Sequence, residues 1–169
     1  MNKSTQMMCC TVLAVAAAVA PTFANASPAG DKKFLATAAQ ADQNEIALSK
    51  LAQQKASNPD VKAFAGKMVD EHTQMTETMK PFATSRGLTP PMGPDADHQK
   101  ELDKLNGLNG ADFDKEYMSQ MVTDHTKALS AFTSEAKSSN DPKLKAAVID
   151  GKTHVAAHKN MAYDLKKKL

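Results

Sequence analysis

The chain has 169 residues, a length that suits a single domain. Lys and Arg number 21 and Asp and Glu number 19, so the formal charge is only +2, which argues against a protein that binds nucleic acid or acidic lipid through its overall field. Trp is absent, runs of β-branched residues are missing, and Ala, Leu, Met, Lys and Gln are frequent, which favours an all-α fold.

Residues 1–26 have the pattern of a secretory signal peptide. A short polar start precedes an apolar run over residues 7–20, and residues 24–26 read Ala-Asn-Ala, a small-x-small cleavage site. The run of 14 residues is shorter than the roughly 20 that a membrane-spanning helix needs. We therefore expect a cleaved signal, a mature single domain over residues 27–169 without a transmembrane segment, and a periplasmic or secreted location.

Both cysteines, Cys9 and Cys10, lie inside this signal. The mature domain would then have no disulfide, no thiolate metal ligand and no thiol nucleophile. Because a nucleophile elbow and a glycine-rich phosphate loop are also missing, we do not expect a classical enzyme.

The first half of the domain predicts two helices, over residues 31–56 and 59–85, joined by a tight turn. Apolar residues recur every three or four positions in both, and Asn58 and Pro59 lie where one helix stops and the next starts. Gly87 is expected to end the second helix. The inward stripes contain Phe34, Ala38, Ala41, Glu45, Leu48 and Ala52 in the first helix, and Val61, Phe64, Ala65, Met68, His72, Met75, Met79 and Phe82 in the second.

Residues 87–111 form a long connection. Its proline-rich start is expected to be extended, residues 98–105 suit a short helix, and His98 is expected to be exposed. A helix of ~27 residues spans ~40 Å, so a connection of this length can run back along the helix and let the second and third long helices lie parallel. This connectivity predicts a ferritin-like four-helix bundle with a long crossover between the second and third helices, and an up-down-up-down bundle is the alternative.

A second helical pair follows the connection. Asp112 is the expected N-cap of one helix, residues 138–142 break it, and the last helix covers residues 142–168. The inward positions are Phe113, Tyr117, Met121, His125, Phe132, Leu144, Val148, Gly151, Val155, His158, Ala162 and Leu165.

Residues 68–73 and 121–126 nearly repeat each other, and each stretch places a histidine on an apolar stripe. A buried imidazole needs a polar partner. Each long helix carries one such inward residue, and their spacing from the turns puts all four near one level of the bundle. We therefore predict one transition-metal ion, Zn, Mn, Fe, Ni or Cu, bound by Glu45, His72, His125 and His158.

Three further residues are candidates near this site. His154, one turn before His158, is an additional candidate ligand. Asp124 and Tyr117 are candidates to form hydrogen bonds that orient the ligand side chains. The alternative is a metal-free polar layer in which the same side chains bond one another and set the helix register.

Several stretches carry a family resemblance: residues 45–52, residues 61–65 leading to His72, residues 113–117 leading to His125, and His158 with Ala162. In these stretches, and over the chain between Phe34 and Leu165, the sequence resembles DUF4142, an exported bacterial family of unknown function. The resemblance implies a ferritin-like fold and export. The Glu-x-x-His pairs of di-iron ferritin-like proteins are missing, so iron-storage chemistry is not expected.

Two functions remain open at this point. One is an exported metal-binding bundle for metal handling or stress defence. The other is a non-enzymatic envelope or stress protein that acts through a protein partner and uses the polar layer for packing alone.

Overall fold

The computed structural model describes residues 28–169, so the expected signal peptide lies outside the described residues. Its five helices are α1 (Pro28–Lys55), α2 (Pro59–Ser85), α3 (Ala96–Asn106), α4 (Gly110–Ser138) and α5 (Pro142–Lys166). Within residues 28–169, no helix combines the length and the apolarity that crossing a membrane requires.

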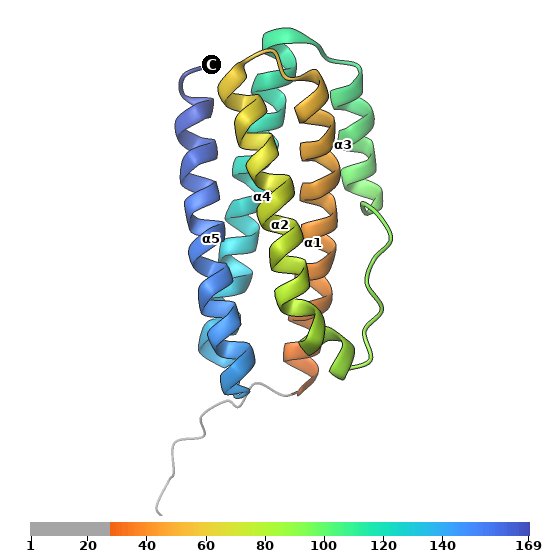
Figure 1. Cartoon of the computed structure of the whole chain (residues 1–169), viewed down its shortest axis with the longest axis vertical. Coiled ribbons are helices and arrows are strands. Elements are labelled where there is room, and N and C mark those ends of the chain that lie inside the picture. The colour runs from red at the N-terminus through yellow and green to blue at the C-terminus, as the bar shows by residue number, and fades with distance from the viewer. Residues whose placement is uncertain (1–27) are drawn as a thin grey trace, which may run out of the picture.

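The four long helices form a bundle (Figure 1). The hairpins α1–α2 and α4–α5 are antiparallel, and contacts of α1 with α4 and of α2 with α5 close the bundle. The connection after α2 returns along the outside, where α3 packs on α1 and α4, so α2 and α4 run in the same direction. The predicted ferritin-like connectivity is confirmed, and the up-down-up-down alternative is wrong.

Capping side chains define where most of these helices begin. Asn58, Asp95 and Asp141 each accept hydrogen bonds from two backbone N–H groups in the first turns of α2, α3 and α5 respectively. Gly87 ends α2 with a φ of 66°, a left-handed conformation that glycine adopts without steric cost, as predicted.

The predicted N-cap of α4, Asp112, is wrong by three residues. α4 begins at Gly110, and Asn109 occupies the N-cap without a side-chain hydrogen bond. The carbonyl of Asn109 accepts from the N–H of Phe113, so the first helical turn forms before Asp112. α1 likewise begins at Pro28, three residues ahead of the predicted start.

The core consists of two apolar clusters, one in each half of the bundle. One cluster is built around Leu48, Val61, Phe64, Met68, Leu105, Phe113, Tyr117, Met118 and Met121. The other is built around Phe34, Leu35, Met75, Met79, Phe132, Leu144, Val148 and Val155. A layer of buried polar side chains lies at intermediate positions along all four long helices, and it includes Asp42, Glu45, His72, His125 and His158.

Two local contacts position neighbouring helices, one within the α4–α5 pair and one between the α1–α2 turn and α4. At Gly151 of α5, an added Cβ would lie 2.6 Å from Cε1 of Phe132, so α4 and α5 approach each other there only because residue 151 has no side chain. At the opposite end, the buried carboxylate of Asp114 accepts hydrogen bonds from the backbone N–H groups of Ser57 and Asn58. It thereby anchors the α1–α2 turn to α4.

Candidate metal centre

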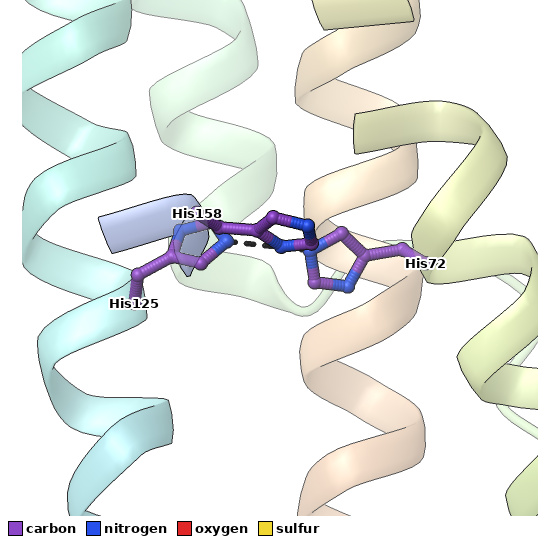
Figure 2. A group of neighbouring side chains, drawn as sticks. All are labelled: His72, His125 and His158. Atoms are coloured by element: carbon purple, nitrogen blue, oxygen red, sulfur yellow. Dashed lines mark hydrogen bonds between the residues drawn. The ribbon is translucent and has the colours of Figure 1, made fainter. Parts of the chain in front are cut away.

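Three imidazole rings meet in the polar layer, from His72 on α2, His125 on α4 and His158 on α5 (Figure 2). One nitrogen from each ring lies within 4.8 Å of the others, and the ring centroids are 5.3–5.4 Å apart. The three residues are 3%, 1% and 0% exposed. Local helix geometry explains the arrangement, because each histidine continues the apolar stripe that faces the bundle axis.

The outer nitrogens of two of these rings are held by oxygen acceptors. Nδ1 of His72 donates to the carboxylate of Asp42 at 2.9 Å, and Nδ1 of His125 donates to the backbone carbonyl of Met121 at 2.8 Å. A carbonyl and a carboxylate can only accept, so each Nδ1 carries a proton, and in a neutral ring the lone pair is then on Nε2. Asp42 is itself oriented by a hydrogen bond from the hydroxyl of Thr76 at 3.0 Å.

The two Nε2 atoms face each other, since Nε2 of His72 lies 3.3 Å from Nε2 of His125. This contact, the dashed line in Figure 2, is a hydrogen bond only if one of the two rings carries a proton on Nε2. Burial, followed by the neighbouring rings of His72 and His158, lowers the pKa of His125 to about 3. The ring of His125 is therefore neutral at pH 7, and the lone pair on its Nε2 can bind a metal ion or accept a hydrogen bond.

His158 completes the group. Its Nε2 donates to the carboxylate of Glu71, and among the described residues its buried Nδ1 has no hydrogen-bond partner. Burial lowers the pKa of His158 to about 4, although the bond to Glu71 acts in the opposite direction. Partial burial would raise the pKa of Glu71, but hydrogen bonds from Lys67 and His158 lower it to about 2, so this carboxylate is ionised. Each ring thus has one nitrogen that donates to an oxygen acceptor, and in its neutral form it has a lone pair on the other nitrogen.

Glu45, predicted as the fourth ligand, lies beside this group. It is 4% exposed, and its Oε1 is 3.7 Å from Nδ1 of His125, whereas the free lone pair of that ring is on Nε2. Its Oε2 is buried without a hydrogen-bond partner in the described part of the chain. Burial above all, and then the charges of Asp124 and Asp42, raises the pKa of Glu45 well above its usual value, which favours the neutral acid.

The two predicted supporting residues contact other partners. The hydroxyl of Tyr117 lies 2.8 Å from that of Ser49, and burial raises its pKa. Asp124 lies 3.3 Å from Nε2 of His98, which is the connection histidine expected to be exposed. That expectation is wrong: the His98 side chain is only 17% exposed, because α3 folds back onto α1 and α4 and places it between Asp95 and Asp124.

His154, the additional candidate ligand, lies at the surface. Its side chain is 47% exposed, and its Nδ1 is 3.7 Å from a carboxylate oxygen of Glu71. Sequence reasoning did not identify Asp42 and Glu71 as partners of the histidines. The sequence does hold a clue to each of them. Asp42 lies one turn before Glu45 on the same helix, and Glu71 lies next to His72 on the flank of the apolar stripe.

A cavity of about 480 Å³ reaches this group from the side of α1 and α4. Its lining includes Glu45, His72 and His125, together with apolar residues such as Met75 and Phe132. His72 and His125 therefore border a cavity, and a small exogenous ligand has room beside them.

Comparisons with known proteins agree with this fold. A model of the family described as "Domain of unknown function (DUF4142)" matches residues 16–165. The chain resembles a structure of CopM in the Cu(II)-bound form, with 21% identity, a TM-score of 0.70, and 82% of this chain and 96% of CopM covered. The Ag-bound form of CopM gives 20% identity, a TM-score of 0.69 and the same coverage.

A DUF305 fragment from Deinococcus radiodurans is also similar, with 11% identity and a TM-score of 0.72 over 83% of this chain and 97% of the fragment. At these identities the likeness concerns the fold. No curated protein matches the sequence.

Proposed function

The chain belongs to the DUF4142 family, and on that premise we propose that its bundle binds one transition-metal ion through Nε2 of His72, Nε2 of His125 and Nδ1 of His158. One observation carries the proposal: three buried imidazoles converge, with one nitrogen of each within 4.8 Å of the others, and an oxygen acceptor lies at hydrogen-bond distance from one nitrogen of each ring. This is how proteins orient histidines that ligate a metal.

The donor set narrows the choice of metal. Neutral imidazoles suit Zn, Cu, Fe and Ni, whereas Mn prefers carboxylates. The two acidic partners, Asp42 and Glu71, add negative charge just outside the ligands, which makes the rings more basic donors. That the related fold of CopM is known in Cu(II)-bound and Ag-bound forms supports copper as one occupant.

Three protein ligands leave a coordination position open, and the cavity lies beside it. Glu45 lines the same cavity and is the candidate to fill that position. The charge of a bound cation lowers the pKa of a nearby carboxyl group, so we propose that Glu45 becomes ionised and joins as a fourth ligand when the metal enters.

The proposed role is metal handling outside the cytoplasm, as a carrier or buffer and in defence against metal stress. It depends on the proposed cleavage after residue 26, which N-terminal sequencing of the exported protein tests. The proposed role needs no reaction chemistry, and the sequence has neither a nucleophile elbow nor a glycine-rich phosphate-binding loop.

The test is elemental analysis of untagged protein purified without chelator, for the wild type and for His125→Ala. We expect about one metal ion per chain in the wild type and none in the variant. His98→Ala is the matched control, because it removes a histidine that contacts Asp95 and Asp124 and not the three central rings.

A wild type that is metal-free, and that gains no thermal stability from added Zn, Cu, Fe or Ni salts, would overturn the proposal. In that case the polar layer serves helix packing, and the function is to be sought at the surface, in contacts with an envelope protein.

A further inference from the structure

A second group of donors lies on the outer side of His158. Single donor atoms of Glu71, His154 and His158 lie within 4.8 Å of one another. Unlike the buried centre, this group is open to solvent, since the side chains of Glu71 and His154 are 25% and 47% exposed. A small surface cavity of about 50 Å³ between α2 and α5 is lined by Glu71, His154 and Asp150.

Helix geometry connects this surface group to the buried one. Asp150, His154 and His158 follow at intervals of four residues, so they form one row along α5 that passes from the surface to the core. On α2, Glu71 and His72 are neighbours, and one contacts the outer nitrogen of His158 while the other belongs to the inner group.

His158 belongs to both groups, and its chemistry allows it to serve one at a time. A neutral imidazole has one lone pair, because the other nitrogen carries the proton. When Nε2 binds an outer ion, Nδ1 keeps the proton. When Nδ1 binds an inner ion, Nε2 keeps the proton and donates it to Glu71, as the structure shows.

We propose that Glu71, His154 and His158 form a solvent-accessible loading site that captures a divalent transition-metal ion and passes it to the buried three-histidine centre. This inference rests on the proposed function. In the transfer the ion leaves Nε2 for Nδ1, Nδ1 releases its proton to water and Nε2 takes one up, so the charge of the ring is unchanged.

The ligand set of the loading site favours divalent ions. One carboxylate and two imidazoles are typical of Zn(II) sites, whereas Cu(I) prefers sulfur ligands. Lys67 competes with the ion, because its ammonium group pairs with Glu71. Asp150 adds negative charge to the same surface, with an oxygen 4.0 Å from Nε2 of His154.

The larger cavity beside α1 and α4 is less suited to capturing an ion. Among its described lining residues, Asp42 is bonded to His72, and His98 is held between Asp95 and Asp124. Apart from the buried centre, to which His72 and His125 belong, no group of three donor atoms within 4.8 Å lines this cavity in residues 28–169.

The test is the rate at which metal-free protein takes up Zn(II) from a coloured chelator, and the rate at which a stronger chelator removes it. We expect His154→Ala to slow both rates by about tenfold. Its final content of about one Zn(II) per chain and its affinity should match the wild type, because a residue that acts only along the route leaves the equilibrium unchanged. Lys67→Gln should accelerate uptake, because it frees Glu71.

Thr153→Ala is the matched control, since Thr153 is exposed next to His154 and its hydroxyl bonds its own helix at Ile149. Unchanged rates in His154→Ala, together with normal Zn(II) binding, would overturn the loading site and leave the buried centre standing. A wild type that takes up no Zn(II), or a His125→Ala variant that binds it as the wild type does, would instead overturn the proposed function.

Discussion

Replacing His125 by Gln should have opposite effects on stability with and without metal. When both rings are neutral in the metal-free protein, Nε2 of His72 and Nε2 of His125 are two acceptors 3.3 Å apart. A Gln side chain at position 125 can place its amide –NH₂ near the position of Nε2 and donate to His72. The carbonyl of Met121 loses the ring donor but keeps its helical hydrogen bond within α4.

The magnitude follows from these contacts. An unmade hydrogen bond to a buried polar atom costs about 1–3 kcal/mol, and a made one contributes about 1 kcal/mol. After the loss of side-chain entropy, we expect metal-free His125→Gln to be more stable than the metal-free wild type by about 1 kcal/mol, a rise in Tm of roughly 3–5 °C. With Zn(II) at a hundred times its Kd, the wild type should gain about 2.7 kcal/mol and become the more stable protein.

The assay is thermal and urea unfolding at pH 7, followed by circular dichroism, with chelator and then with Zn(II). His98→Gln serves as the control, since it changes a histidine outside the centre. If metal-free His125→Gln is less stable than the wild type by 1 kcal/mol or more, the contact between the two Nε2 atoms does not destabilise the metal-free protein, and this reasoning is refuted. If both proteins respond equally to Zn(II), His125 is not a ligand.

Three further changes test the frame that holds the centre. Gly151→Ala should lower stability by about 1–3 kcal/mol, because the new methyl group overlaps Phe132; an unchanged Tm would refute this packing. Asp114→Asn should cost about 1.5–3 kcal/mol in urea unfolding, because the charged acceptor of the α1–α2 turn is lost; a neutral effect would contradict its role. Burial first, then the hydrogen bond with Asp31, raises the pKa of Glu135 to about 7. The folded state therefore binds the proton of Glu135 more tightly than the unfolded state does. The stability that this binding contributes is lost as the pH rises through about 7. Glu135→Gln should then be more stable than the wild type at pH 8, by up to about 3 kcal/mol, and similar to it at pH 5; equal pH profiles would refute the shift.

Much of the fold was accessible from local patterns. The spacing of apolar residues predicted the four long helices, and Asn58 and Gly87 marked two of their ends correctly because capping depends on residues a few positions apart. The start of α4 was misplaced because a backbone carbonyl, not the side chain of Asp112, begins the helix.

The polar layer could be predicted in outline for the same reason. Helical periodicity alone places His72, His125 and His158 on inward faces, and the turns bring them to one level, where the structure finds them together. The position of His98 was misjudged, because its burial depends on α3 packing against α1 and α4 and not on its own neighbours in sequence.

The chemistry of the centre depends on contacts between helices that lie far apart along the chain. The bond from His72 to Asp42 joins residues 30 positions apart, and that from His158 to Glu71 joins residues 87 apart. These contacts follow from how each helix is rotated against its neighbours and from which rotamer each ring adopts. A periodic pattern of apolar residues indicates which face of a helix points inward. It does not specify the side-chain rotamer, on which the direction of each ring nitrogen depends. The pattern of residues therefore located the three histidines, and the packing of the bundle selected the nitrogen of each that faces inward.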